Sequence, residues 1–132
     1  MMSTPTRLLS VMIVSIAMVV PFTGAGRAAD EIKVGVIHWK DFAYAQMMKH
    51  SYDMAVEAVN ASGGVKGRKL KLVFADDQGR RREGERAVVE LVKTQGAVML
   101  VGGYSSSNTL YSAMAADRLG IPFLVSTAAD DR

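Results

Sequence analysis

The 132-residue chain contains no cysteine. This absence excludes disulfide frameworks, zinc sites built on thiolates and cysteine nucleophiles, so packing has to supply the stability. Proline and tryptophan are also scarce, with three and one residues. Hydrophobic residues make up 49% of the chain and charged residues 22%, a balance typical of globular proteins rather than disordered ones. A chain of this length holds at most one small domain or part of a larger one.

The first 28 residues have the three parts of a secretory signal peptide. Arg7 supplies the positive charge, residues 8–20 form an apolar run, and residues 21–28 are mostly small. As a helix the apolar run would be about 20 Å long, too short for a hydrocarbon core of about 30 Å. We therefore expect cleavage after Ala28, export to the periplasm and no membrane-spanning segment in the mature chain.

The net charge of +3 depends largely on this segment. Residues 29–132 keep 14 basic and 13 acidic side chains, because Arg7 and Arg27 lie before the cleavage site. A nearly neutral domain has no electrostatic footprint for nucleic acid. An exported domain without disulfides is typical of the bacterial periplasm.

Short β-branched segments alternate with amphipathic helical segments along the mature chain. The predicted strands are residues 32–37, 70–75, 97–101 and 121–125, and the predicted helices are residues 45–61, 82–95 and 106–119. The β-α-β-α-β-α-β order predicts an α/β fold, an open parallel sheet with right-handed crossovers and helices on both faces. With the strand order 2-1-3-4, a ligand crevice is expected between the first and third strands.

Three consecutive serines follow the third predicted strand and begin the third helix. Ser105, Ser106 and Ser107 therefore lie at the predicted crevice, beside backbone amides that have no helical partner. Such helix N-termini bind anions because the macrodipole adds about half a positive charge. Capping of the helix explains one serine, whereas three in a row favour contact with a ligand.

Enzyme signatures are missing from these loops. A serine hydrolase needs glycines on both sides of its nucleophile, and here Gly103 precedes Ser105 but Ser107 fills the second glycine position. His38 and His50 lack an organised carboxylate partner for a metal. We therefore expect no enzyme, no cofactor and no metal, and a small periplasmic serine hydrolase remains the alternative from another class.

The loop after the first strand is aromatic and the second helix begins in a run of charges. Trp39, Phe42 and Tyr44 are placed to cover an organic ligand, although packing into the fold explains any one of them equally well. Residues 80–86 carry four arginines and two glutamates, and we interpret this run as a solvated helix face with ion pairs.

Several phrases, in this order and spacing, resemble the periplasmic solute-binding proteins of the branched-chain amino acid type. The phrases are residues 32–37 (IKVGVI), 59–70 (VNASGGVKGRKL), 74–77 (FADD), 101–107 (VGGYSSS) and 120–122 (GIP). The resemblance covers the whole mature chain and implies a type I periplasmic binding fold. It also implies the substrate-binding component of an ABC importer, with a permease of the inner membrane as partner.

The resemblance further implies a set of ligand-binding residues. Ser106 matches the serine that holds the ligand's α-carboxylate, with Ser105 nearby, Ala129 supplies backbone and Tyr44 matches the covering aromatic. Asp130 stands where a threonine commonly receives the carboxylate. Two carboxylates about 4 Å apart repel by about 1 kcal/mol in water and about 4 kcal/mol at an effective dielectric constant of 20. An amide, aromatic or cationic ligand therefore competes with a simple aliphatic amino acid.

The family builds its site between two lobes that close on the ligand. The sequence is then a signal peptide (1–28) followed by an incomplete N-terminal lobe (29–132). We expect weak or no ligand binding by this chain alone, because one wall cannot bury a small molecule. A ligand-sensing domain of a receptor or regulator uses the same fold and remains the alternative within the class.

Overall fold

The computed structural model describes residues 31–129, so the predicted signal peptide and Asp130 lie outside the described residues. The elements in chain order are β1 (Ile32–His38), α1 (Ala45–Ala61), β2 (Leu70–Asp76), α2 (Arg81–Val89), the π-helical turn η1 (Glu90–Thr94), β3 (Met99–Gly102), α3 (Ser106–Arg118) and β4 (Phe123–Val125).

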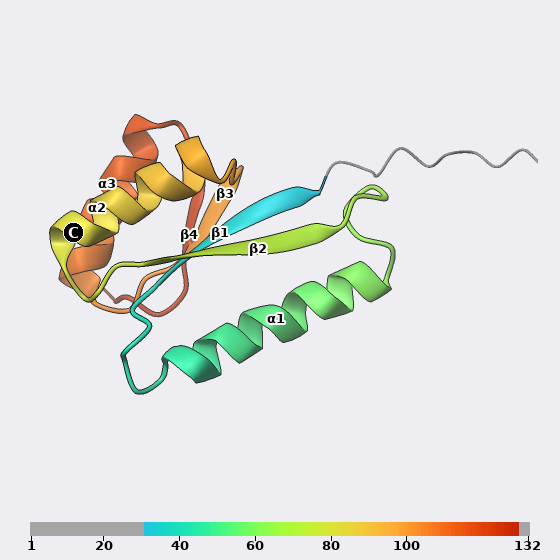
Figure 1. Cartoon of the computed structure of the whole chain (residues 1–132), viewed down its shortest axis with the longest axis horizontal. Coiled ribbons are helices and arrows are strands. Elements are labelled where there is room, and N and C mark those ends of the chain that lie inside the picture. Colours follow the sequence, from blue (N-terminus) through green and yellow to red (C-terminus); the bar gives the residue numbers. More distant parts are fainter. Residues whose placement is uncertain (1–30, 130–132) are drawn as a thin grey trace, which may run out of the picture.

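The four strands form one parallel sheet in the order β2-β1-β3-β4. Helix α1 lies along one face of this sheet, and α2 and α3 lie against the other (Figure 1). The predicted α/β class and strand order are confirmed. The order of the strands reverses between β1 and β3, which places the expected crevice at the carboxyl ends of these two strands.

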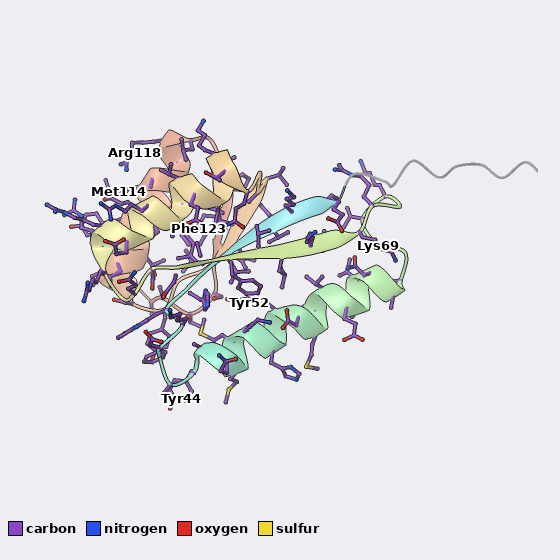
Figure 2. All side chains as sticks on the ribbon, in the orientation of Figure 1. Tyr44, Tyr52, Lys69, Met114, Arg118 and Phe123 are labelled. Carbon is purple, nitrogen blue, oxygen red and sulfur yellow. The ribbon has the colours of Figure 1, made fainter. Side chains whose placement is uncertain are left out.

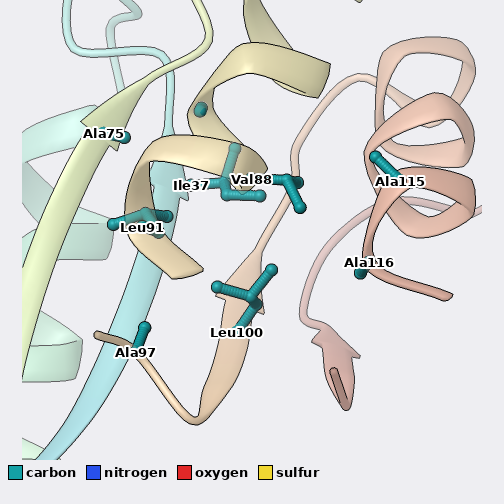
Figure 3. Close-up of a cluster of buried hydrophobic side chains, with 9 residues drawn as sticks. Ile37, Ala75, Val88, Leu91, Ala97, Leu100, Ala115 and Ala116 are labelled. Carbon is teal, nitrogen blue, oxygen red and sulfur yellow. The ribbon is translucent and has the colours of Figure 1, made fainter. Parts of the chain in front are cut away.

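The main core lies between the sheet and the layer of α2, η1 and α3 (Figure 3). Ile37, Leu91 and Leu100 are at most 1% exposed there. Gly35 leaves room for core side chains from both layers, because a Cβ at this position would lie 2.6 Å from Leu100 Cδ2 of β3 and 3.1 Å from Leu91 Cδ1 of η1. Burying a side chain such as Leu100 stabilises the fold by about 1.5–3 kcal/mol.

Helices α2 and α3 touch each other through a glycine. A Cβ at Gly84 would lie 2.6 Å from Ser112 Oγ, so α3 approaches the bare backbone of α2 here. Asn108 Nδ2 also donates to the Gly79 carbonyl at 2.5 Å. These contacts fix the beginning of α3 relative to the turn between β2 and α2.

Helix α1 packs less completely on the other face of the sheet. Val36 is fully buried below it, but Met47 and Met54 on the helix are 66% and 57% exposed. Its end is fastened by Asn60, which donates to the Leu70 carbonyl at 2.9 Å and accepts from the Leu70 N–H at 2.7 Å. Leu124 of β4, also on this side, is 63% exposed.

Three predicted elements differ from the structure by two residues or more, among them the strand predicted from residue 97, which begins at Met99. Residues 82–95 were expected to form one α-helix, but the α-helix ends at Val89 and continues as the π-helical turn η1. The Gln95 N–H donates to the Glu90 carbonyl at 3.0 Å, one residue beyond the α-helical partner. The strand predicted from residue 121 begins at Phe123. Pro122 lacks an N–H, although its carbonyl accepts from the Leu100 N–H at 2.8 Å.

Candidate ligand-binding site

The loops after all four strands gather at one edge of the sheet. The Asp77 N–H donates to the His38 carbonyl at 3.0 Å, and the Gly103 N–H donates to the Ile37 carbonyl at 3.3 Å. Thr127 Oγ1 donates to the Gly103 carbonyl at 2.6 Å, which brings in the segment after β4. Segments far apart in the sequence therefore form a continuous rim at the point where the strand order reverses.

The N-terminus of α3 is open within this rim. Ser105 occupies the N-cap position in an extended conformation, but no side chain caps the helix. The Ser105 and Ser107 hydroxyl oxygens lie 3.5 Å apart, at the limit of a hydrogen bond. The interpretation that a serine merely caps this helix is therefore wrong for this structure. The first-turn amides keep the anion-binding character of an uncapped helix end.

Two of the predicted site residues are brought into direct contact. The Ala129 N–H donates to Ser106 Oγ at 3.1 Å, although the residues are 23 positions apart. Ser106 is half-buried and Ala129 is exposed, so the pair lies at the surface of the rim. A hydroxyl that accepts one hydrogen bond still has its own hydrogen to donate.

An aromatic cluster stands beside the serines. Phe42 stacks on Trp39 with ring centroids 5.3 Å apart, meets Tyr44 edge-on at 5.5 Å, and lies 4.1 Å from the ring of Tyr104. Tyr44 and Tyr104 are 54% and 42% exposed, so each keeps part of its ring for another molecule. The cluster links the predicted aromatic loop to the serine loop.

Sequence reasoning missed Tyr104 and a second link across the rim. Tyr104 directly precedes the three serines, and this position in the sequence could have marked it as a candidate site residue. The Tyr52 hydroxyl on α1 lies 2.8 Å from the Ser126 hydroxyl, and the two residues are 74 positions apart. Figure 2 shows Tyr52 directed from α1 toward the sheet. No local pattern indicates such a pair, because only the packing of α1 brings it together.

Asp77 is a buried carboxyl at the edge of the rim, with 4% of the residue exposed. Burial raises the pKa of its carboxyl above the ordinary value, opposed by the hydrogen bond from the Gly79 N–H. This bond, 3.0 Å long, shapes the turn in which Gly79 has a φ of 63° and lies against the Trp39 ring. Asp77 therefore helps to position the aromatic loop.

His38, the last residue of β1, contacts the backbone and an aromatic ring of β2. His38 Nδ1 lies 3.2 Å from the Ala75 carbonyl, and its ring packs edge-on against Phe74. Among residues 31–129, no cluster of three or more His, Asp or Glu side chains is arranged to hold a metal. None of the described helices is long and apolar enough to cross a membrane.

In parallel α/β sheets, small molecules bind at the switch point of the strand order, where this structure has an uncapped helix N-terminus and aromatic side chains. A family model described as "Periplasmic binding protein" matches residues 14–132. The chain belongs to this family.

Curated relatives and solved structures agree with this assignment. An "Amino acid binding protein" from Pseudomonas aeruginosa is 37% identical over 67 residues, or 51% of this chain. A "Leu/Ile/Val-binding protein homolog 3" from Brucella melitensis is 35% identical over 81 residues, or 59% of this chain. The ABC transporter substrate-binding protein from Desulfitobacterium hafniense, solved in complex with Leu, is 27% identical over 77% of this chain, with a TM-score of 0.68.

These matches involve a limited part of each larger protein. They span 18% and 22% of the two relatives and 30% of the solved chain.

Proposed function

We propose that this chain carries part of the ligand site of an ABC importer's substrate-binding protein. The ligand is an amino acid, an amide or a related small molecule, and the protein acts outside the cytoplasm with an inner-membrane permease as partner. The observation that carries the proposal is the uncapped N-terminus of α3, where Ser106 and Ala129 meet beside the aromatic cluster. The names of the relatives support an amino acid as the first ligand to test.

In this proposal Ser106 donates its hydroxyl hydrogen to the ligand's carboxylate. Its oxygen already accepts from the Ala129 N–H, which orients the hydroxyl, and its hydrogen has no acceptor among the described residues. The unpaired amides at the beginning of α3 and the helix dipole add to the attraction for a negative group. Ser105 lies beside this group, and Asp130 follows Ala129 directly in the sequence.

The aromatic cluster receives the rest of the ligand. Tyr44 and Tyr104 present partly exposed rings on either side of Phe42. Aliphatic and aromatic ligand side chains both pack on such faces. The carboxylate and the apolar part of an amino acid are thus received by neighbouring loops.

NMR of the ¹⁵N-labelled chain titrated with leucine tests this proposal. The described rim is open, so we expect a weak complex with shifts confined to amides of the first turn of α3 and the aromatic loop. Ser106→Ala removes a hydrogen bond to a charged group, for which about 1.5–3 kcal/mol, or about ten- to a hundredfold in affinity, is typical.

Ser62→Ala is the matched control, since Ser62 is an exposed serine at the far end of α1. It should leave the leucine titration unchanged. Equal affinities of the Ser106→Ala variant and the parent chain, or shifts located away from the rim, would contradict the site. Acetate in place of leucine measures the contribution of the carboxylate alone.

A further inference from the structure

A concave surface lies between α2, η1 and α3. The groove has a volume of about 720 Å³ and is lined by α2, η1 and α3. It contains none of the residues of the ligand-binding rim. Its floor is apolar, because Val89, Ala115 and Leu119 contribute to the lining.

The lining follows one stripe on each helix. Arg82, Glu85 and Val89 recur at spacings of three and four on α2, and Arg118 lies three residues after Ala115 on α3. Figure 2 shows Arg118 on α3 close to Met114, which is 48% exposed. The two stripes make a groove with an apolar floor and charged walls, the form that accepts an amphipathic helix.

One glutamate of the groove forms an ion pair, and the other accepts a hydrogen bond from a neutral side chain. Glu85 pairs with Arg81 at 3.5 Å, and Glu90 accepts from Gln95 Nε2 at 2.8 Å. Arg82 and Arg118 have no ion pair within residues 31–129. Arg86, which also lines the groove, pairs with Glu83 at 3.3 Å. Among the described residues, two arginines and Glu90 therefore have no ion pair, which leaves the groove with a net positive charge.

The π-helical turn η1 is a second, independent feature of this groove. Glu90 and Thr94, the first and last residues of η1, both line the groove. Short π-helical turns are rare and are found frequently at functional sites. The turn directly follows α2 and contributes these two residues to the wall of the groove.

An extended partner fits the groove better than a small molecule. Small-molecule sites cover most of their ligand, whereas Arg82, Val89, Glu90 and Arg118 here are all exposed. A helix laid along the groove can bury Val89 and Leu119 and bring its carboxylates to the two arginines. Carboxylates on the partner would complement the charge that the groove leaves unpaired.

We propose that the α2–α3 groove is a docking site for an amphipathic helix of a partner protein with glutamates or aspartates beside its apolar stripe. Arg82 and Arg118 select the acidic partner, and the floor of Val89, Ala115 and Leu119 supplies the apolar contact. This surface is separate from the ligand-binding rim, so the inference holds or fails independently of the proposed ligand.

Fluorescence anisotropy with two labelled synthetic helices tests this inference. One peptide carries an apolar stripe flanked by glutamates, and the other has lysines in place of the glutamates. The acidic peptide should bind the full chain more weakly as salt is raised, and the basic peptide should not bind. The R82E/R118E variant should bind the acidic peptide at least about fivefold more weakly, because both ion pairs between the arginines and the peptide's glutamates are lost.

The R80E/K93E variant is the matched control, since it makes the same change of charge on the same segment at two residues outside the groove lining. It should keep most of the affinity. Val89→Ser, at an exposed position, tests the apolar floor and should weaken binding while circular dichroism stays unchanged. Equal loss in both double variants, or equal binding of both peptides, would overturn the proposal. Self-association of the chain that R82E/R118E abolishes would assign the groove to a second copy and also overturn it.

Discussion

Gly103 connects the fold to the serine loop, and its replacement by alanine is a direct test of how that loop is built. The residue has a φ of 83°, in the left-handed region that L-residues avoid. A Cβ at this position would lie 2.5 Å from Thr109 Cγ2 and 2.6 Å from Thr109 Oγ1. Thr109 belongs to α3, so the clash pushes the beginning of this helix away from β3.

The expected destabilisation has two contributions. The left-handed conformation costs an alanine about 1–2 kcal/mol, and overpacking against a buried side chain costs about 1–3 kcal/mol. The free energy of unfolding should therefore fall by about 2–5 kcal/mol. Gly120→Ala measures the cost of the left-handed conformation without the clash, because Gly120 has a φ of 66° but nothing lies within 4 Å of an added Cβ. The free energy of unfolding of this control should fall by only about 1–2 kcal/mol.

Urea unfolding of the full chain, followed by circular dichroism, measures both variants. The double variant Gly103→Ala/Thr109→Ala should recover about 1 kcal/mol or more relative to the sum of the single variants, since the clashing atoms are absent. Thr109 suits this cycle because its buried hydroxyl has no hydrogen-bond partner in the structure. A Gly103→Ala variant no less stable than Gly120→Ala, or an absence of coupling with Thr109, would refute the reasoning.

Two further predictions concern the core and pH. Leu100→Ala at the fully buried centre should lower the free energy of unfolding by about 2–5 kcal/mol, measured by urea unfolding against the exposed Leu124→Ala. Asp77→Asn addresses the carboxyl whose pKa burial raises above 3.8. The folded parent binds this proton more tightly than the unfolded chain, so its stability falls as pH rises from 3.8 through the folded-state pKa. The stability difference between the Asn variant and the parent should grow over that range in pH-dependent unfolding, and a constant difference would contradict the assignment.

Local patterns predicted the fold well, because each strand is short and β-branched and each helix has one apolar face. The parallel sheet followed from the alternation of elements and the handedness of crossovers, whereas the order β2-β1-β3-β4 was taken as a common order for such sheets. The π-helical turn was not predictable in this way. The residues of η1 have ordinary helical propensity, and no local pattern marks the change from α-helical to π-helical hydrogen bonding.

The candidate site was predictable only in part. The serine loop followed from its position after the third strand, and the resemblance to a family pointed to Ser106, Ala129 and Tyr44. The contacts of Tyr104 with Phe42 and of Tyr52 with Ser126 join residues 62 and 74 positions apart. Sequence periodicity carries no information at such separations, so these contacts required the packed structure.

The two sides of the rim are supported by helices that pack on the sheet to different extents. Ser106 begins α3, which is fastened to α2 at Gly84 and to the core through Ala115 and Ala116. The aromatic loop instead leads into α1, whose Met47 and Met54 are exposed and whose cover of the sheet is incomplete. Because elements with few buried contacts open at lower free energy, the aromatic side of the rim is the more adaptable one. A fixed serine side and an adaptable aromatic side together suit a site that keeps the carboxylate in one place while the rest of the ligand varies.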